Sequence, residues 1–233
     1  MKKKVLLTIL IILVVMCGAV FLLFPLKEVK VTGCDMASEE AVVETVKNMA
    51  PMNNTLLLYL KIKFKGIDDI PFVSKVNISF DGRNKVVVDV YEKSTAGCFE
   101  YMEHYIYFDK NGIVLDTSDK KKDTVPCIRG LEFENWERGE KLPLEDKKKF
   151  DIILKITQLI EKYELGIDEI LFTKDSEIVV MCNGIEVQLG DGSNISVQLM
   201  NLKSILESLG NKKGVLYMKD FNSSESTATF KEK

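Results

Sequence analysis

The longest apolar run of the sequence lies at its beginning. The stretch Val5–Phe24 contains no charged residue, while a lysine cluster at 2–4 precedes it and Lys27 follows it. A helix of that length rises roughly 30 Å, which matches the hydrocarbon thickness of a bilayer. Because an open-ended segment can satisfy its own backbone in lipid only as a helix, the pattern predicts a single transmembrane helix over 5–24.

Two other interpretations compete for this segment. A cleaved signal peptide has an apolar core of about 7–15 residues and then a small-residue cleavage site, whereas this run continues to Phe24 without such a site. A lipoprotein would be acylated at Cys17, but Met16 before it is a poor small-residue position. We favour the uncleaved anchor. The lysines before it place residues 1–4 in the cytoplasm and the remainder outside, by the positive-inside rule.

After the apolar run, the spacing of apolar positions indicates a β-α-α-β-β unit. Alternation predicts strands, whereas apolar residues on one helical face, preceded by Ser38 as an N-cap, predict a helix that Pro51 closes. A second helical segment fits less cleanly, because part of it also alternates. The expected elements in chain order are a strand at 28–32, a helix from 38 to 51, the ambiguous segment 56–70, and a hairpin of 73–80 and 85–91.

The remainder of the chain combines short strands with two amphipathic helices. Turn signals such as Asn111-Gly112 and Asn183-Gly184 separate strands that alternate or are rich in aromatic residues. Strands are expected at 99–102, 105–108, 113–115, 178–181, 185–189, 215–218 and 227–230, and helices at 144–165 and 194–209. The fold class predicted for the whole chain is therefore α+β.

Charge and composition exclude some kinds of partner. The formal net charge is −3, and leaving out the three lysines at 2–4 makes the remainder −6. A net negative chain does not suit nucleic acid or a polybasic clamp on anionic lipid. Four cysteines follow the apolar run, widely spaced and without a C-x-x-C pair: Cys34, Cys98, Cys127 and Cys182. Disulfides are open to them in an oxidising compartment, but we favour single buried thiols.

The sequence contains little that catalysis requires. His104 is the single histidine, which excludes H-E-x-x-H and multi-histidine zinc sites, and an exposed strand or turn position explains it best. The stretch 109–112 resembles the start of a calcium loop, but Val114 and Lys120 stand where such a loop needs Gly and Glu. Turns also explain 190–192 better than a phosphate cradle does. We therefore predict no enzyme, no cofactor, no metal site and no small-molecule substrate.

The order of several motifs resembles the FtsQ/DivIB family of bacterial cell-division proteins. The motifs that carry the resemblance are Val29-Lys30-Val31-Thr32-Gly33, Ser38-Glu39-Glu40, Ile70-Pro71-Phe72-Val73, Val86 to Lys93 with the acidic Glu92, Tyr107 to Leu115, and Val125 to Gly130. The resemblance implies a cytoplasmic tail at 1–4, a transmembrane helix at 5–24, a POTRA domain at 25–93 and a mixed β domain with two helices at 94–233.

The resemblance also implies a scaffold function. Such proteins bind the FtsB/DivIC-type and FtsL-type bitopic division proteins in the cell membrane and help to control septal peptidoglycan synthesis, so localisation at the division septum is expected. Two other functions compete: a membrane-anchored extracytoplasmic binding or sensory ectodomain, and an envelope enzyme, which the scarcity of catalytic motifs disfavours.

The expected partner-binding residues lie near the C-terminus. A last strand at 227–230 with an open edge could accept a partner strand through backbone hydrogen bonds, which places Thr227 and Thr229 at the interface. Phe221 and Phe230 would be aromatic anchors, or would simply pack in the core; the sequence leaves both open. The edge of the strand at 28–32 is a second expected docking surface.

Overall fold

A computed structural model of the protein describes residues 2–131, 135–144, 146–222, 224 and 227–233. The chain folds into two compact units that meet at Lys93 and Ser94 in the sequence. The first unit comprises residues 1–93 and the second residues 94–233, and each unit is described by itself below.

The expectation of a transmembrane helix over 5–24, and with it the fold class that includes one, is wrong. Among the residues that the structure describes, no helix has the combined length and apolar character that crossing a bilayer requires. The first helix, α1, runs from Lys2 to Leu23. It therefore begins inside the lysine cluster, and it stops before Phe24 because Pro25 disfavours helical backbone in the residue before it. An apolar run shows where charge is absent, whereas a span needs a sufficient length of apolar helix.

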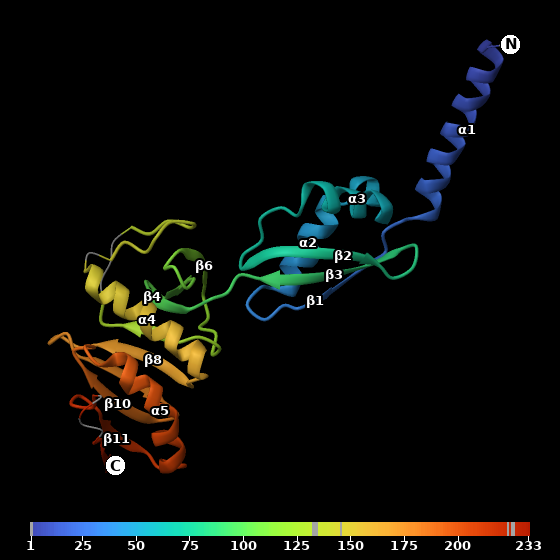
Figure 1. Ribbon diagram of the computed structural model, residues 1–233. Helices are drawn as coiled ribbons and strands as arrows, with labels where there is room; N and C mark the ends of the chain where they lie inside the picture. Colours follow the sequence, from blue (N-terminus) through green and yellow to red (C-terminus); the bar gives the residue numbers. More distant parts are fainter. Residues whose placement is uncertain (1, 132–134, 145, 223, 225–226) are drawn as a thin grey trace. The chain divides into compact units, whose positions relative to one another are not determined.

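The first unit has the expected β-α-α-β-β order after α1. Its elements are β1 (Glu28–Thr32), α2 (Glu39–Met49), a 3-10 turn at Pro51–Asn53, α3 (Thr55–Lys65), β2 (Val73–Phe80) and β3 (Lys85–Glu92). The strand order is β1-β3-β2, with β1 parallel and β2 antiparallel to the central β3. Every second residue of β3 is buried, Val86, Val88 and Val90, so one face of this sheet carries α2 and α3 (Figure 1).

Capping side chains fix the helix starts in this unit. The Ser38 hydroxyl accepts a hydrogen bond from the Ala41 N–H, as expected for an N-cap. The ambiguous segment 56–70 is helical only as far as Lys65; Asn54 caps this helix, accepting from the N–H groups of Leu56 and Leu57. The Asn54 amide also donates to the Val20 carbonyl at 3.1 Å, so one buried side chain joins the end of α1 to the start of α3.

Glu92, at the end of β3, holds the connection between β1 and α2. Its carboxylate accepts hydrogen bonds from three successive backbone N–H groups, those of Asp35, Met36 and Ala37, at 2.8–3.0 Å. Backbone donors to an ionised carboxylate form stronger hydrogen bonds than neutral pairs do. The acidic residue at this position therefore fixes the approach of the chain to the N-terminus of α2.

We expect Glu92→Gln to lower the free energy of unfolding by about 1–3 kcal/mol, because an amide oxygen replaces the charged acceptor of these bonds. Urea denaturation followed by circular dichroism measures the change. The matched control is Glu28→Gln, which removes an exposed carboxylate that pairs with Lys85 at 2.8 Å and should cost less than about 1 kcal/mol. Equal losses for the two variants would contradict the role of Glu92.

The second unit is built on a mixed sheet of nine strands. Its elements are β4 (Gly97–Tyr101), β5 (His104–Phe108), β6 (Val114–Ser118), β7 (Cys127–Arg129), α4 (Lys147–Tyr163), β8 (Ile167–Phe172), β9 (Ile178–Cys182), β10 (Ile185–Gly190), α5 (Ile195–Leu209), β11 (Gly214–Tyr217) and β12 (Thr229–Glu232). The order across the sheet is β12-β11-β10-β9-β8-β7-β4-β5-β6. The β10–β11, β7–β8 and β4–β7 pairs are parallel.

Both long helices pack on one face of this sheet (Figure 1). Buried residues of α4, such as Ile153 and Ile156, and of α5, such as Leu199 and Leu202, share one hydrophobic core with alternate residues of the strands. Buried Gln198 of α5 donates to the carbonyls of Leu189 and Met218, at 2.9 and 2.7 Å. This amide ties α5 to the ends of β10 and β11.

The expected strands and helices are present with small shifts, and two strands were missed. The helix expected at 144–165 begins after its cap Asp146 and ends at Tyr163; the next residue, Glu164, adopts a left-handed conformation (φ 51°) two residues before Gly166. The missed strands are β7 and β8. They occupy the middle of the sheet and join its β4-β5-β6 part to its β9–β12 part.

Candidate functional site

The last strand, β12, forms one edge of the nine-stranded sheet. It pairs antiparallel with β11, with Leu216 opposite Phe230 and Tyr217 opposite Thr229. Among the described residues, β12 has no strand on its other side. This places Thr229 and Phe230 on an edge strand, as the sequence predicts, whereas Thr227 lies just before the strand.

The register shows which backbone groups of β12 face outward. The Lys233 N–H donates to the Lys213 carbonyl at 3.1 Å, so these two residues form a hydrogen-bonded pair of the ladder. In an antiparallel ladder such pairs alternate with pairs whose backbone groups point away from each other. Thr229 and Lys231 therefore bond to β11, while Phe230 and Glu232 direct their N–H and C=O groups to the open edge.

The opposite edge strand of the sheet, β6, differs from β12 because another part of the chain forms hydrogen bonds with it. The carbonyl of Glu140 accepts from the Val114 N–H of β6 at 2.8 Å, and the Gly139 N–H donates to the Val114 carbonyl at 2.9 Å. The Arg138 side chain adds a hydrogen bond to the Leu115 carbonyl and an ion pair with Asp116. Among the described residues of this nine-stranded sheet, β12 is thus the edge without such a cover.

Gly214 of β11 allows β12 to lie close against its neighbour. A Cβ atom at this position would meet the Lys231 carbonyl and come within 2.9 Å of the Phe230 ring. The ring therefore covers the backbone of the glycine on the next strand, an arrangement that compensates for a missing side chain in a sheet. No sequence motif pointed to Gly214, because its role depends on the cross-strand register.

A hollow lies on each side of the edge. The helix-side hollow, of about 450 Å³, is lined by Asn201, Ser204, Ile205, Ser208, Phe221 and Ala228. The outer hollow, of about 310 Å³, is lined by Tyr217, Lys219, Asp220, Thr227 and Thr229. Side chains of an added strand would alternate between the two sides, so a partner segment could place successive residues in the two hollows.

The two phenylalanines differ in their surroundings. Phe221 is only 5% exposed and belongs to the hydrophobic core. Phe230 is half-buried and packs on the border of that core. Core packing, which the sequence left open, therefore describes Phe221, whereas Phe230 keeps part of its ring at the edge.

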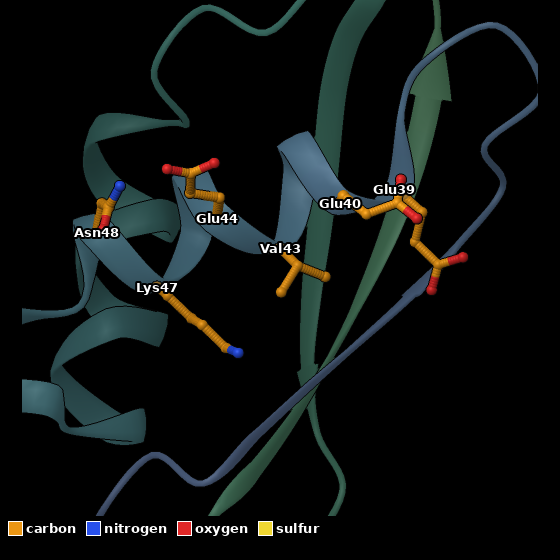
Figure 2. A pocket seen from close by; sticks show the side chains of 6 residues that line it. All are labelled: Glu39, Glu40, Val43, Glu44, Lys47 and Asn48. Carbon is orange, nitrogen blue, oxygen red and sulfur yellow. The ribbon is translucent and has the colours of Figure 1, made fainter.

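A second surface lies in the first unit, on α2. Residues at successive helical turns line a hollow of about 500 Å³: Glu39, Glu40, Val43, Glu44, Lys47 and Asn48 (Figure 2). Figure 2 shows the Val43 and Lys47 side chains extending from the same side of the helix. The neighbouring β1 is an edge strand of its sheet. The expected docking edge at 28–32 thus adjoins a mostly charged helical surface.

The side chains that the sequence offered for catalysis or ion binding form hydrogen bonds or ion pairs within the fold. The His104 Nδ1 atom lies 2.8 Å from an Asp119 carboxylate oxygen, and both side chains are exposed. Asp191 caps a turn by accepting from the Ser193 N–H at 2.9 Å, and this hydrogen bond lowers the pKa of the Asp191 carboxyl. Within the described residues, no three His, Cys, Asp or Glu side chains gather as metal ligands would.

Comparisons with known proteins give no family assignment: no protein-family model matches the chain, and neither does any curated protein.

We expect Gly214→Val to detach β12, because the new side chain would collide with the Lys231 carbonyl and the Phe230 ring. The cost should be about 1–3 kcal/mol of unfolding free energy, as for overpacked sites generally. Faster amide hydrogen exchange at Lys231 and Thr229, whose N–H groups bond to β11, measures the detachment. Tyr217→Val, at an exposed position of the same strand, is the control, and equal exchange in both variants would refute this role of Gly214.

Proposed function

We propose that the protein is a non-catalytic scaffold of the bacterial cell-division machinery, of the FtsQ/DivIB kind, and that it binds a partner protein by accepting a strand on β12. The observation that carries the proposal is the open edge of β12, where the backbone groups of Phe230 and Glu232 point away from β11. Strand addition derives its affinity from such backbone groups, and its specificity from the side-chain hollows beside them.

Charge at the edge supports a specific partner rather than self-association. Lys231, Glu232 and Lys233 follow Phe230 in succession. Charged residues on an edge strand discourage pairing with arbitrary strands, including that of a second copy. A partner strand with complementary charges and an apolar residue for the surface beside Phe230 would overcome this barrier. The DivIC-type and FtsL-type division proteins are the proposed partners, and the β1 edge with the α2 hollow is the proposed second docking surface.

We expect Glu232→Pro to weaken binding of the DivIC-type partner by about tenfold or more, because it removes an outward-facing N–H and places a ring where the partner backbone would lie. The bonds from β12 to β11 remain, since the Glu232 N–H does not take part in them. Isothermal titration with the purified partner measures the change.

The matched control for this substitution is Glu232→Ala, which removes only the side chain and its 3.8 Å ion pair with Lys212; it should cost little. Truncation before Thr227 and Phe230→Asp should also weaken binding. If folded Glu232→Pro protein binds as well as Glu232→Ala protein does, strand addition at β12 is excluded.

Localisation in cells tests whether the protein acts in division, independently of whether β12 binds the partner. A fluorescent protein fused to the N-terminus should concentrate at the septum of dividing cells. The fusion carrying Glu232→Pro should reach the septum while recruiting less of the DivIC-type partner, provided that the second docking surface brings it there. Uniform labelling of unsubstituted fusion protein in dividing cells would argue against a division function altogether.

A further inference from the structure

Cys98 and Cys127 lie side by side on the face of the nine-stranded sheet that faces away from the helices. They are registered partners in the parallel β4–β7 pair. The next residues of the two strands, Phe99 and Ile128, belong to the helix-covered core, and side chains alternate along strands. Both thiols are buried, with exposed fractions of 0% and 1%.

The two thiols are close enough to interact directly. Each thiol shifts the pKa of the other, and both are free thiols. Neighbouring strands lie about 4.8 Å apart, which falls within the Cα separation of about 4.4–6.8 Å that disulfides require. Cys127 is the first residue of the three-residue strand β7, so it lies at a strand end rather than within a long strand.

A segment before β7 covers the pair, and we call residues 119–126 the cover segment. Tyr107 of β5 holds its backbone: the hydroxyl donates to the Lys120 carbonyl at 3.2 Å and accepts from the Lys122 N–H at 2.9 Å. The Lys121 ammonium reaches the Asp168 carbonyl of β8 at 3.1 Å. Because β4 and β7 lie between β5 and β8, the Lys121 side chain extends across the two strands that carry the thiols.

The surroundings make Cys127 the more nucleophilic thiol. The neighbouring Cys98 thiol lowers the pKa of Cys127 below its ordinary value against the effect of burial, helped by the charges of Arg129 and Lys121. The same interaction raises the pKa of Cys98, and burial raises the pKa of Cys182 to about 11. The charged and titratable groups around the pair come from β4, β5, β7, β8 and the cover segment: Glu100, Tyr105, Tyr107, Arg129, Glu169 and Lys121.

We propose that Cys98 and Cys127 form a reversible intramolecular disulfide when the protein meets a hydroperoxide. The Cys127 thiolate attacks one oxygen of hydrogen peroxide; the O–O bond breaks, a sulfenic acid forms on Cys127, and the released hydroxide takes up a proton to become water. The Cys98 sulfur then attacks the Cys127 sulfur and the S–O bond breaks. The hydroxide that leaves takes the Cys98 proton, so two thiols and one peroxide give one disulfide and two waters.

The disulfide would reinforce the strand pair of this sheet that has the fewest registered residue pairs. The β4–β7 pair has two registered residue pairs, Cys98 with Cys127 and Phe99 with Ile128, whereas the other strand pairs of this sheet have three or more. A disulfide there would join β4 covalently to β7, which itself pairs with β8. The inference concerns a modification site and is independent of the proposed scaffold function.

The test is oxidation of the full-length protein with stoichiometric hydrogen peroxide, followed by alkylation of the remaining thiols, proteolysis and mass spectrometry. We expect two of the five thiols to be lost, one linked peptide pair joining Cys98 to Cys127, and recovery of both thiols with dithiothreitol. The Cys34→Ser and Cys182→Ser variants should give the same linked pair. The proposal is overturned if Cys34 or Cys182 oxidises while both Cys98 and Cys127 remain alkylated, or if the disulfides join two chains.

A second measurement tests the cover segment. Tyr107→Phe removes the hydroxyl that holds Lys120 and Lys122, so opening should become easier and disulfide formation roughly tenfold faster. The rate should also rise with pH as Cys127 loses its proton, and it should do so below the pH at which an ordinary thiol ionises, because the pKa of Cys127 is lowered. An unchanged rate in folded Tyr107→Phe protein would show that the cover segment does not control access. In the Cys98→Ser variant, the reaction should stop at oxidised Cys127, and no disulfide-linked peptide pair should form. If that variant does not fold, the peptide mapping of the unsubstituted protein still tests the proposal.

Discussion

The backbone hydrogen-bond ladder of the nine-stranded sheet is the constraint on which the second unit depends. Every strand inside the sheet must find partners on both sides, since an unsatisfied buried backbone group costs free energy comparable to a lost hydrogen bond. The two edge strands meet this constraint differently. β6 is covered by the chain around Gly139 and Glu140, whereas β12 leaves Phe230 and Glu232 directed outward, and that difference is what makes one edge a candidate interface.

Much of this architecture follows from local patterns in the sequence. The Ser38 cap, the hairpin of β2 and β3, and the amphipathic helices α4 and α5 were predictable because each depends on residues close together in the chain. The expected edge strand near 227–230 also agrees with β12 to within two residues at each end. Short-range physics, namely capping, turn chemistry and periodicity, is sufficient for all of these.

Features that depend on long-range register were not predictable. β7 has three residues, too few for alternation to distinguish a strand from a loop, so the neighbouring positions of Cys98 and Cys127 could not be deduced. The close approach at Gly214 has the same origin. The transmembrane expectation over 5–24 was wrong although α1 (Lys2–Leu23) covers most of that run, because no helix among the described residues is long and apolar enough to cross a bilayer.

The sheet also separates the candidate interface from the thiol pair. Five strand-to-strand steps lie between β12 and β7, which at about 4.8 Å each amount to roughly 24 Å. Effects at sites farther apart than about 10 Å that share no partners usually add independently. The two sites do not share side chains: Phe230 packs on the helix-covered face, whereas Cys98 and Cys127 lie on the other face. Oxidation of the thiols should therefore leave the affinity of β12 for a partner strand unchanged, and an effect of oxidation on binding would require the intervening strands β8 to β11 to move together.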